Sequence, residues 1–256
     1  MRLATWNVNS LKVRLPQVLD WLAINQPDVL CLQETKLQDE NFPVAEIVAV
    51  GYQPIYSGQK TYNGVALLSR QIGGEVVAAI PSLDDPQKRV LAATFNDVRV
   101  ICIYVPNGES VESEKYPYKL KWLAALNEWL RDELNRHPKL ALLGDFNIAP
   151  DDRDVHDPAL WEGKVLCSQP EREALQRLIN LGLQDGFRLF EQPEKSYTWW
   201  DYRMMAFRRN MGMRIDHILL SKELAASCTS CAIDKATRKL ERPSDHAPVM
   251  ATFDIP

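Results

Sequence analysis

A carboxylate and an amide stand two residues apart just after an apolar run near the middle of the chain. Leu140 to Leu143 follow a His-Pro pair that interrupts regular structure, and they have the pattern of a buried strand. Asp145 and Asn147 lie at the carboxyl end of this strand. Because side chains alternate along an extended chain, Asp145 and Asn147 point to the same side, while Phe146 turns into the core. The pair therefore predicts a polar patch that could belong to an active site. The alternative is a loop in which both side chains bond only to the backbone.

Two other predicted strands end in polar side chains of the same kind. The strand over 3–9 finishes with Asn7 and Asn9, and the strand that begins at residue 29 runs directly into Glu34, with Lys36 two residues later. An α/β protein assembles one site from distant pieces of chain by placing polar residues at the ends of several buried strands. These strand ends therefore predict one site that combines carboxylates, amides and a cation.

Three further signals point to the same site. Tyr104 ends a strand just before a Pro-Asn-Gly turn, and Asp216 lies among apolar residues, where an unpaired carboxylate would be costly. Asp245 and His246 set a carboxylate beside an imidazole at the entrance to the last strand. Separately, Asp216 could be an ion-pair partner, His246 a core histidine and Tyr104 a core ring. Because all of them stand at strand ends, a shared catalytic site is the better interpretation.

The composition is that of an ordinary globular protein. The chain has 256 residues, of which 46% are hydrophobic and 25% charged, and no linker divides it, so we expect one domain over residues 1–256. No charged-then-apolar leader opens the chain and no apolar run is long enough to cross a membrane, which predicts a cytoplasmic protein. The net charge of −4 argues against coating nucleic acid by bulk charge, so any contact with a polyanion must be local.

The five cysteines are odd in number and scattered, which indicates reduced thiols rather than disulfides. Cys228 and Cys231 form a lone pair without further ligands at zinc-finger spacing, so we expect no zinc site. The acidic stretch 151–157 could hold a cation, but a solvated loop is the better interpretation.

Hydrophobic periodicity predicts helices outside a strand-rich centre. A first helix, with Pro16 in its first turn, joins the strands 3–9 and 29–34; a long helix spans about 116–136, and Ser168 opens another with a capping box. Apolar and β-branched runs predict strands over 3–9, 29–34, 52–56, 65–69, 75–80, 90–95, 99–105, 140–143, 196–199, 214–220, 228–233 and 247–253. Both halves are rich in strands, which favours an α/β protein with two packed sheets flanked by helices.

The order of the polar blocks resembles that of the exonuclease III and apurinic/apyrimidinic (AP) endonuclease family, within the magnesium-dependent phosphodiesterases similar to deoxyribonuclease I. Blocks such as GDFNIAP at 144–150 and SDHAP at 244–248 occur in register with those at 6–9, 32–36, 57–60, 63–66, 104–110, 199–203 and 214–217. The resemblance implies a four-layer α/β sandwich, in which two mixed β-sheets pack face to face with helices outside. It places the active site at one edge of the paired sheets.

The resemblance also implies a metal site in which Glu34 is the main ligand, with Asn7 and Asp245 nearby. Oxygen ligands without a thiolate suit Mg²⁺, or Mn²⁺ as a substitute, rather than zinc. In a scheme with two metal ions, further ligands would come from Asp145, Asn147 and His246. The sequence leaves the number of metal ions open.

The same resemblance implies roles around a phosphate group. Asp145 would orient and deprotonate the attacking water, or in a rival scheme protonate the leaving oxygen, and Asn147 would hold the phosphate. His246, oriented by Asp216, would donate to a non-bridging oxygen, and Tyr104 would support the same charge. Such donors and a metal ion stabilise the charge that accumulates on phosphate oxygens.

The stretch 203–214 is locally basic within this acidic chain, and it holds four of the six methionines. Apolar side chains between arginines suit a loop that wedges into a distorted duplex while neutralising phosphates; the alternative is a mobile surface loop. The resemblance places Trp199, Met213 and Ile215 around a flipped sugar. The expected DNA contacts are Lys36, Trp199, Arg203, Met204, Met205, Arg208, Arg209, Met213 and Ile215.

These implications predict a monomeric DNA-repair phosphodiesterase that acts on double-stranded DNA, cuts 5′ to abasic sites, trims blocked 3′ ends and has 3′-to-5′ exonuclease activity. A phosphoinositide or small-molecule phosphodiesterase on the same scaffold is the alternative, and the block at 199–203 argues against it. A nucleic-acid-binding relic would normally have lost Glu34, Asp145 or His246, and all three are present. The balance among the DNA activities is left open.

Overall fold

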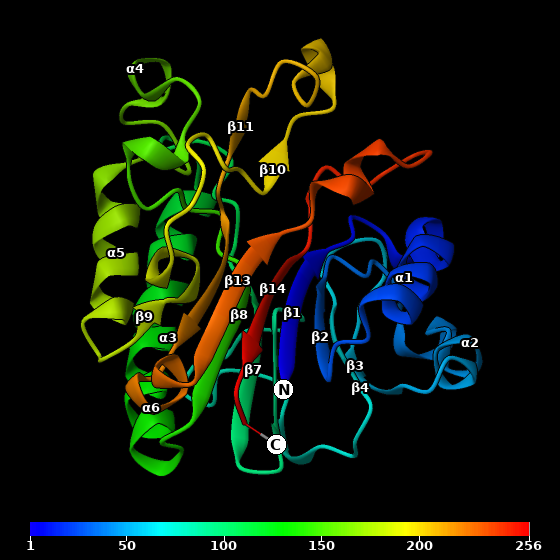
Figure 1. Ribbon diagram of the computed structural model, residues 1–256. Helices are drawn as coiled ribbons and strands as arrows, with labels where there is room; N and C mark the ends of the chain where they lie inside the picture. The colour runs from blue at the N-terminus through cyan, green and yellow to red at the C-terminus, as the bar shows by residue number, and fades with distance from the viewer. Residues whose placement is uncertain (256) are drawn as a thin grey trace.

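Two six-stranded β-sheets packed face to face form the centre of the computed structural model, which describes residues 1–255 (Figure 1). Helices α1 (Leu11–Asn25) and α2 (Val44–Ala49) cover the outer face of one sheet, and α3 (Lys115–Arg136) and α5 (Gln169–Ile179) cover the outer face of the other. These four layers confirm the predicted sandwich of two mixed sheets with helices outside. None of the described helices combines the length and the apolar character that crossing a bilayer requires.

The first sheet has the strand order β13-β14-β1-β2-β4-β3. Its strands are β1 (Arg2–Asn7), β2 (Val29–Gln33), β3 (Gln53–Ser57), β4 (Val65–Ser69), β13 (Cys228–Ile233) and β14 (Val249–Phe253). Strands β1 and β2 are parallel and are joined by α1, whereas the other neighbours are antiparallel. The strand–helix–strand unit expected at the start of the chain is therefore confirmed.

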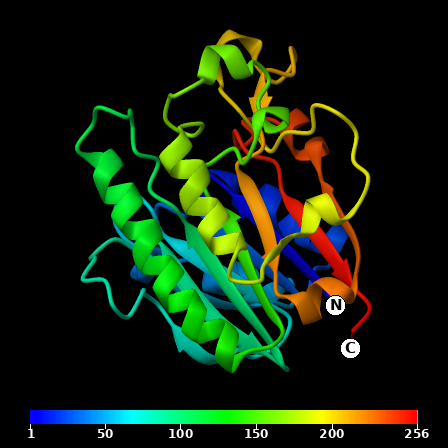
Figure 2. The same cartoon turned by 90° about the vertical axis from the view of Figure 1, so that its left-hand side faces the viewer.

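The second sheet has the order β5-β6-β7-β8-β12-β9. Its strands are β5 (Gly74–Val77), β6 (Val90–Phe95), β7 (Val98–Tyr104), β8 (Leu140–Asp145), β9 (Gln184–Asp185) and β12 (Asp216–Leu220). Strands β7 and β8 are parallel and are connected through α3, which lies beside α5 across this sheet (Figure 2). The remaining elements are α4 (Pro158–Trp161), α6 (Lys222–Ala226), the hairpin of β10 (Trp199–Trp200) and β11 (Gly212–Met213), and short 3₁₀ turns at Asp39–Asn41, Asp152–Asp154, Gly186–Leu189, Arg203–Met205 and Lys235–Lys239.

Alternating side chains explain why each sheet is covered on both faces. On β8, Ala141 and Leu143 lie in the core between the sheets, while Leu140 and Leu142 pack toward α3 and α5. A central strand that is apolar on both faces must be covered on both, and this is the pattern of parallel strands in α/β proteins. The continuous apolar run in the sequence is therefore the direct cause of the layered architecture.

The carboxyl ends of the two parallel pairs meet at one edge of the sandwich. Asn7 lies opposite Gln33 in the first sheet, and Tyr104 lies opposite Asp145 in the second. Strand β12 begins at the same edge, with Asp216 opposite Asp145. Strand register alone therefore brings together residues that are far apart in the sequence.

Some element boundaries differ from those expected. Helix α1 begins at Leu11, so Pro16 lies inside the helix and not in its first turn; the missing backbone donor is tolerated because the opposite face of the helix is packed in the core. The strand expected over 196–199 is reduced to the pair Trp199–Trp200. The long helix and the capping box at Ser168 are confirmed.

Candidate active site

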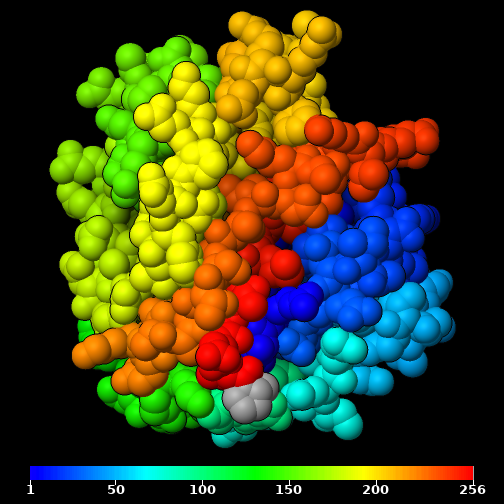
Figure 3. Space-filling view, viewed as in Figure 1, coloured from blue at the N-terminus to red at the C-terminus, as the bar shows by residue number. Residues whose placement is uncertain are grey.

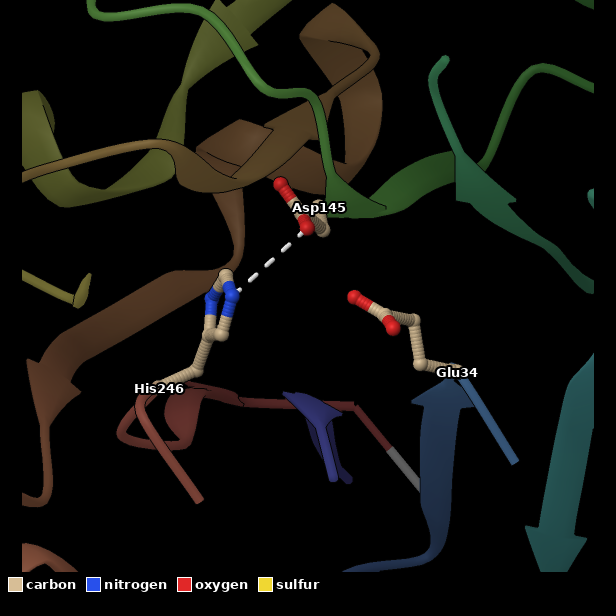
Figure 4. A group of neighbouring side chains, drawn as sticks. All are labelled: Glu34, Asp145 and His246. Carbon is tan, nitrogen blue, oxygen red and sulfur yellow. Dashed lines mark ion pairs between the residues drawn. The ribbon is translucent and has the colours of Figure 1, made fainter. Parts of the chain in front are cut away.

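Glu34, Asp145 and His246 converge at the edge of the paired sheets from three separate parts of the chain (Figure 4). Their carboxylate and imidazole atoms lie within 4.8 Å of one another. Asp145 and His246 are buried, whereas Glu34 is partly exposed. The three side chains therefore surround one point, with Glu34 on its solvent side.

Asp216 orients the imidazole of His246. Its Oδ2 lies 2.8 Å from Nδ1 of His246, and Nε2 of the ring lies 3.8 Å from Oδ2 of Asp145. Burial by itself would lower the pKa of His246, but the charges of Asp216 and Asp145 raise this pKa to about 10. At neutral pH the ring is therefore an imidazolium whose Nε2–H is directed at the common point.

Asp145 accepts a hydrogen bond on each carboxylate oxygen. Its Oδ1 accepts from the backbone N–H of Asn147 at 2.9 Å, and its Oδ2 accepts from Nδ2 of Asn7 at 2.8 Å. Burial raises the pKa of Asp145 above that of an ordinary aspartate, against the opposing effect of the His246 charge. A buried carboxylate with a raised pKa is suited to accept a proton near neutral pH.

Asn147 lies beside Asp145, but not because of strand alternation. Its φ of 50° is left-handed, a conformation that Asn tolerates better than most residues, so the chain turns immediately after β8. Its Nδ2 donates to the carbonyl of Val105 at 3.1 Å, and its Oδ1 accepts from Nδ2 of Asn107 at 2.9 Å. Asn107 is not among the residues expected from the sequence; the signal that could have indicated it is its place in the turn after Tyr104.

Glu34 is surrounded by groups that donate hydrogen bonds. Its Oε1 accepts from Nδ2 of Asn7 at 3.0 Å, and its Oε2 lies 2.8 Å from Nζ of Lys36.

Burial, followed by the charges of Glu34 and Asp145, holds the pKa of the Tyr104 phenol well above its usual range. Tyr104 therefore remains a hydrogen-bond donor at every physiological pH.

Asp245 lies next to His246, but both of its oxygens are already engaged. Oδ1 accepts from Nδ2 of Asn9 at 2.9 Å, and Oδ2 accepts from Nε1 of Trp199 at 3.0 Å. Burial would raise the pKa of Asp245, but the His246 charge and these two hydrogen bonds lower it. Asn9 also accepts from Nζ of Lys36 at 2.5 Å, so it links Asp245 to the Glu34 side of the site.

The donor set fits a hard divalent cation. Glu34 and Asp145 offer carboxylate oxygens, and the group contains no thiolate; His246, while it is protonated, is a hydrogen-bond donor and not a ligand. The Nδ2 of Asn7 donates to both carboxylates and so bridges them. Glu34 is therefore well placed to hold an ion. Asn7 would first have to turn its Oδ1, which accepts from the backbone N–H of Asn9 at 3.0 Å, toward the ion, and Asp245 would have to release Asn9 or Trp199.

The basic loop, residues 203–211, projects beside the segment 235–245 at the top of the molecule (Figure 3). Tyr202 ties the two segments together, because its hydroxyl donates to the carbonyl of Pro243 at 2.8 Å. Arg203 is exposed but pairs with Asp201 at 3.1 Å. The loop exposes four other side chains of the expected kinds: Met204 (70%), Met205 (64%), Arg208 and Arg209.

Met213 and Ile215 are placed differently from what the resemblance implied. They are only 0% and 2% exposed and pack in a closed apolar cluster that includes Leu166 and Val155. In this conformation neither side chain offers surface to a flipped sugar. Trp199 pairs with Met213 across the β10–β11 hairpin but remains partly exposed at the border of the cluster.

The sequence predicts a solvated loop over the acidic stretch 151–157, but part of this stretch is buried. Asp154 is buried and accepts from Nε of Arg214 at 2.7 Å, and Arg214 also lies 2.8 Å from Oδ2 of Asp185. Arg214 therefore adds no free charge to the basic surface. It donates to Nδ1 of His217 at 3.0 Å, and Nε2–H of His217 donates to the carbonyl of Ile148 at 2.8 Å.

Comparison with known proteins agrees with this geometry. The sequence profile of the endonuclease/exonuclease/phosphatase family matches residues 4–246. The chain is 38% identical to exodeoxyribonuclease III of Haemophilus influenzae, over 99% of this chain and 100% of that protein. It is similar, over 100% of both chains, to a Neisseria 3′ phosphatase bound to a product DNA hairpin (53% identity, TM-score 0.98) and to an AP endonuclease from Archaeoglobus fulgidus (38% identity, TM-score 0.96). This chain belongs to the endonuclease/exonuclease/phosphatase family.

Proposed function

We propose that the protein is a DNA-repair phosphodiesterase that trims blocked 3′ ends, cuts 5′ to abasic sites and removes nucleotides as a 3′-to-5′ exonuclease. The observation that carries the proposal is the buried carboxylate of Asp145 facing the imidazolium of His246 beside Glu34. The similar proteins, an exodeoxyribonuclease III, a 3′ phosphatase and an AP endonuclease, support it. All three activities need the same step, hydrolysis of a P–O bond at a DNA phosphate.

In this proposal Asp145 accepts the proton of the water that attacks phosphorus. His246, through Nε2–H, and Tyr104, through its phenol, donate to the non-bridging oxygens on which charge accumulates. A preorganised donor of this kind contributes about 2.7–4 kcal/mol to the stabilisation of a transition state. Asn147, fixed by Asn107, holds the phosphate beside Asp145. A divalent cation, Mg²⁺ or Mn²⁺, bound at Glu34 with Asn7 and Asp245 would neutralise phosphate charge.

We further infer one domain over residues 1–256 and action as a monomer. One apolar core joins the two sheets, so neither sheet would be covered without the other. The five cysteines are free thiols, which supports the proposal that the protein acts in the reducing environment of the cytoplasm.

The proposed function is tested with three DNA duplexes, which carry a 3′-phosphate at a nick, an abasic analogue or a recessed 3′ end. Each is incubated with Mg²⁺ and then with a chelator. We expect metal-dependent release of phosphate, cleavage 5′ to the abasic analogue and shortening of the recessed strand. Inactivity on all three duplexes, with hydrolysis of a phosphoinositide, would favour the alternative substrate class.

Glu34→Gln is expected to weaken divalent-cation binding and to lower kcat by about tenfold or more, because it removes the most accessible carboxylate of the site. High Mg²⁺ should restore part of the activity. The measurement is a Mg²⁺ titration of 3′-phosphate release, with Glu40→Gln, an exposed glutamate outside the site, as the matched control. A titration curve identical to that of the wild type would remove Glu34 from the metal site.

The exposed side chains of the basic loop are expected to divide into two functions. Arg208→Ala with Arg209→Ala should weaken duplex binding and reduce the slope of log K against log salt by roughly 1–2, because two phosphate contacts are lost. Met204→Ala with Met205→Ala should mainly lower cutting at abasic sites, where an apolar wedge helps to open the duplex.

The control for the arginine pair is Lys121→Ala with Arg131→Ala, which removes two exposed cations from α3. Binding is measured by fluorescence anisotropy over a range of salt concentrations. Hydrolysis of a small phosphodiester should survive in all of these variants, because none of them touches the metal site or Asp145. Equal salt slopes in the test and control variants would place the basic loop outside the DNA interface.

A further inference from the structure

Lys119, on α3, carries a fully buried ammonium group directly behind the active-site loops. Its side chain is 0% exposed, and its Nζ lies 2.7 Å from the carbonyl oxygen of Asn147, 3.0 Å from that of Asn107 and 2.5 Å from Oε1 of Glu171. An ammonium group has three N–H donors. Each donor of Lys119 therefore has one acceptor, and two of these acceptors are backbone carbonyls of the site.

The carboxylate of Glu171 makes this buried charge tolerable. It also accepts from the backbone N–H groups of Leu166 at 3.1 Å and Ser168 at 3.2 Å, and from the Ser168 hydroxyl. The Ser168 hydroxyl in turn lies 2.5 Å from the Tyr116 hydroxyl of α3. A buried ion pair is tolerated when further hydrogen bonds satisfy both partners, as they do here.

The two carbonyls that Lys119 binds belong to the loops in which β7 and β8 end. Asn107 and Asn147 are joined by their side chains at 2.9 Å, and Asn147 has a left-handed backbone. In a loop of this kind the position of the side chain depends on what holds the backbone carbonyl. Lys119 is the group that ties both loops to the outer helix layer.

We propose that Lys119 is a positioning residue for the hydrolytic site, which fixes Asn147 and Asn107 through their backbone carbonyls. The proposal rests on the proposed function. It makes the ion pair with Glu171 a means of holding the ammonium group in place, so the pair matters for catalysis through Lys119 alone. Lys119 itself does not touch substrate.

The same helix offers a control pair. At its other end, Nε of Arg99 lies 2.6 Å from Oε2 of Glu133, and both side chains are as buried as those of Lys119 and Glu171. Breaking either ion pair removes a buried partner from a buried carboxylate, although Glu133 keeps a second cation, Arg136. Only the first pair, however, reaches the carbonyls of Asn107 and Asn147.

The test compares Lys119→Met, Glu171→Gln and Arg99→Met at a temperature where each is folded. All three should unfold more easily than the wild type. Lys119→Met should lower kcat for 3′-phosphate release most, by about tenfold to a hundredfold, since small displacements of positioned groups cost rates of this order. Glu171→Gln, which keeps the ammonium group but removes the charge that holds it, should lower kcat less, and Arg99→Met should leave kcat near that of the wild type. KM should change little. Lys119→Met combined with Glu171→Gln removes both buried charges, so it should recover stability without recovering kcat.

The second readout is hydrogen exchange of residues 144–149, which does not depend on turnover. Protection there should fall most in both variants that lack Lys119, fall less in Glu171→Gln and persist in Arg99→Met. Equal losses of kcat in all three single variants, or wild-type kcat in Lys119→Met, would overturn the proposal. If the wild type hydrolysed no DNA substrate, the proposed function would fail, and the exchange pattern alone would decide whether Lys119 positions the loops.

Discussion

Asp216→Asn and His246→Asn are each expected to lower kcat by about 10²–10⁴-fold, the range for losing a positioned acid–base group. The reason is the short contact between Asp216 and Nδ1 of His246, which fixes the ring and keeps it charged. An asparagine at 216 can still accept a hydrogen bond, but it no longer stabilises the imidazolium. The two residues act as one unit, so the double variant should be little worse than either single variant.

The measurement is single-turnover release of 3′-phosphate by the two single variants and the double variant. Asp185→Asn is the control, because it removes a half-buried carboxylate that pairs with Arg214 outside the site. It should lower stability and leave the rate of the chemical step near that of the wild type. Additive losses in the double variant would show that Asp216 and His246 act separately.

The meeting of the polar strand ends at one edge can be predicted from the sequence, because the end of a strand is a local signal and strand pairing then places it in the fold. The apolar runs before Asp145 and Glu34 define buried strands, and parallel pairing then aligns their polar ends at one edge. No knowledge of the loops is needed for this step. The two-sheet architecture follows from the same runs, since strands that are apolar on both faces need a layer on each side.

Contacts between distant side chains lie outside the reach of this reasoning. Asp154 and Arg214 pair inside the protein although they are far apart in sequence, and each alone has the pattern of a solvated charge. The burial of Met213 likewise depends on the β10–β11 hairpin, whose strands are too short to give a periodic pattern. Lys119 lies on a helix whose polar residues mostly face solvent, so nothing in its neighbours marks it as buried.

The backbone of the site also escaped prediction. Glu34 and Asn147 have positive φ values of 52° and 50°, so each turns away from its strand instead of continuing the alternation. Such conformations are held by tertiary hydrogen bonds and are common at functional sites. Asp145 and Asn147 do lie side by side, but the physical reason for their proximity is the turn and its side-chain bonds.

His217 is expected to make the fold sensitive to acid. Burial, followed by the charge of Arg214, lowers its pKa from 6.5 to about 4 in the folded protein. The unfolded chain therefore binds a proton at His217 before the folded protein does, as the pH falls below about 6.5. Above pH 6.5 the titration of His217 does not change the free energy of unfolding. Between pH 6.5 and pH 4 it should lower this free energy progressively, by about 3 kcal/mol in total.

His217→Gln tests this expectation without removing the hydrogen bonds. The glutamine amide can donate to the carbonyl of Ile148, and its oxygen can accept from Arg214, but the side chain does not titrate. The free energy of unfolding is measured in urea at several pH values from neutral to acidic. Carboxylates contribute to the acid dependence of both proteins, so the informative quantity is the difference between the two curves. That difference should grow steadily as the pH falls from 6.5 toward 4, and parallel curves would show that His217 does not resist protonation in the folded state.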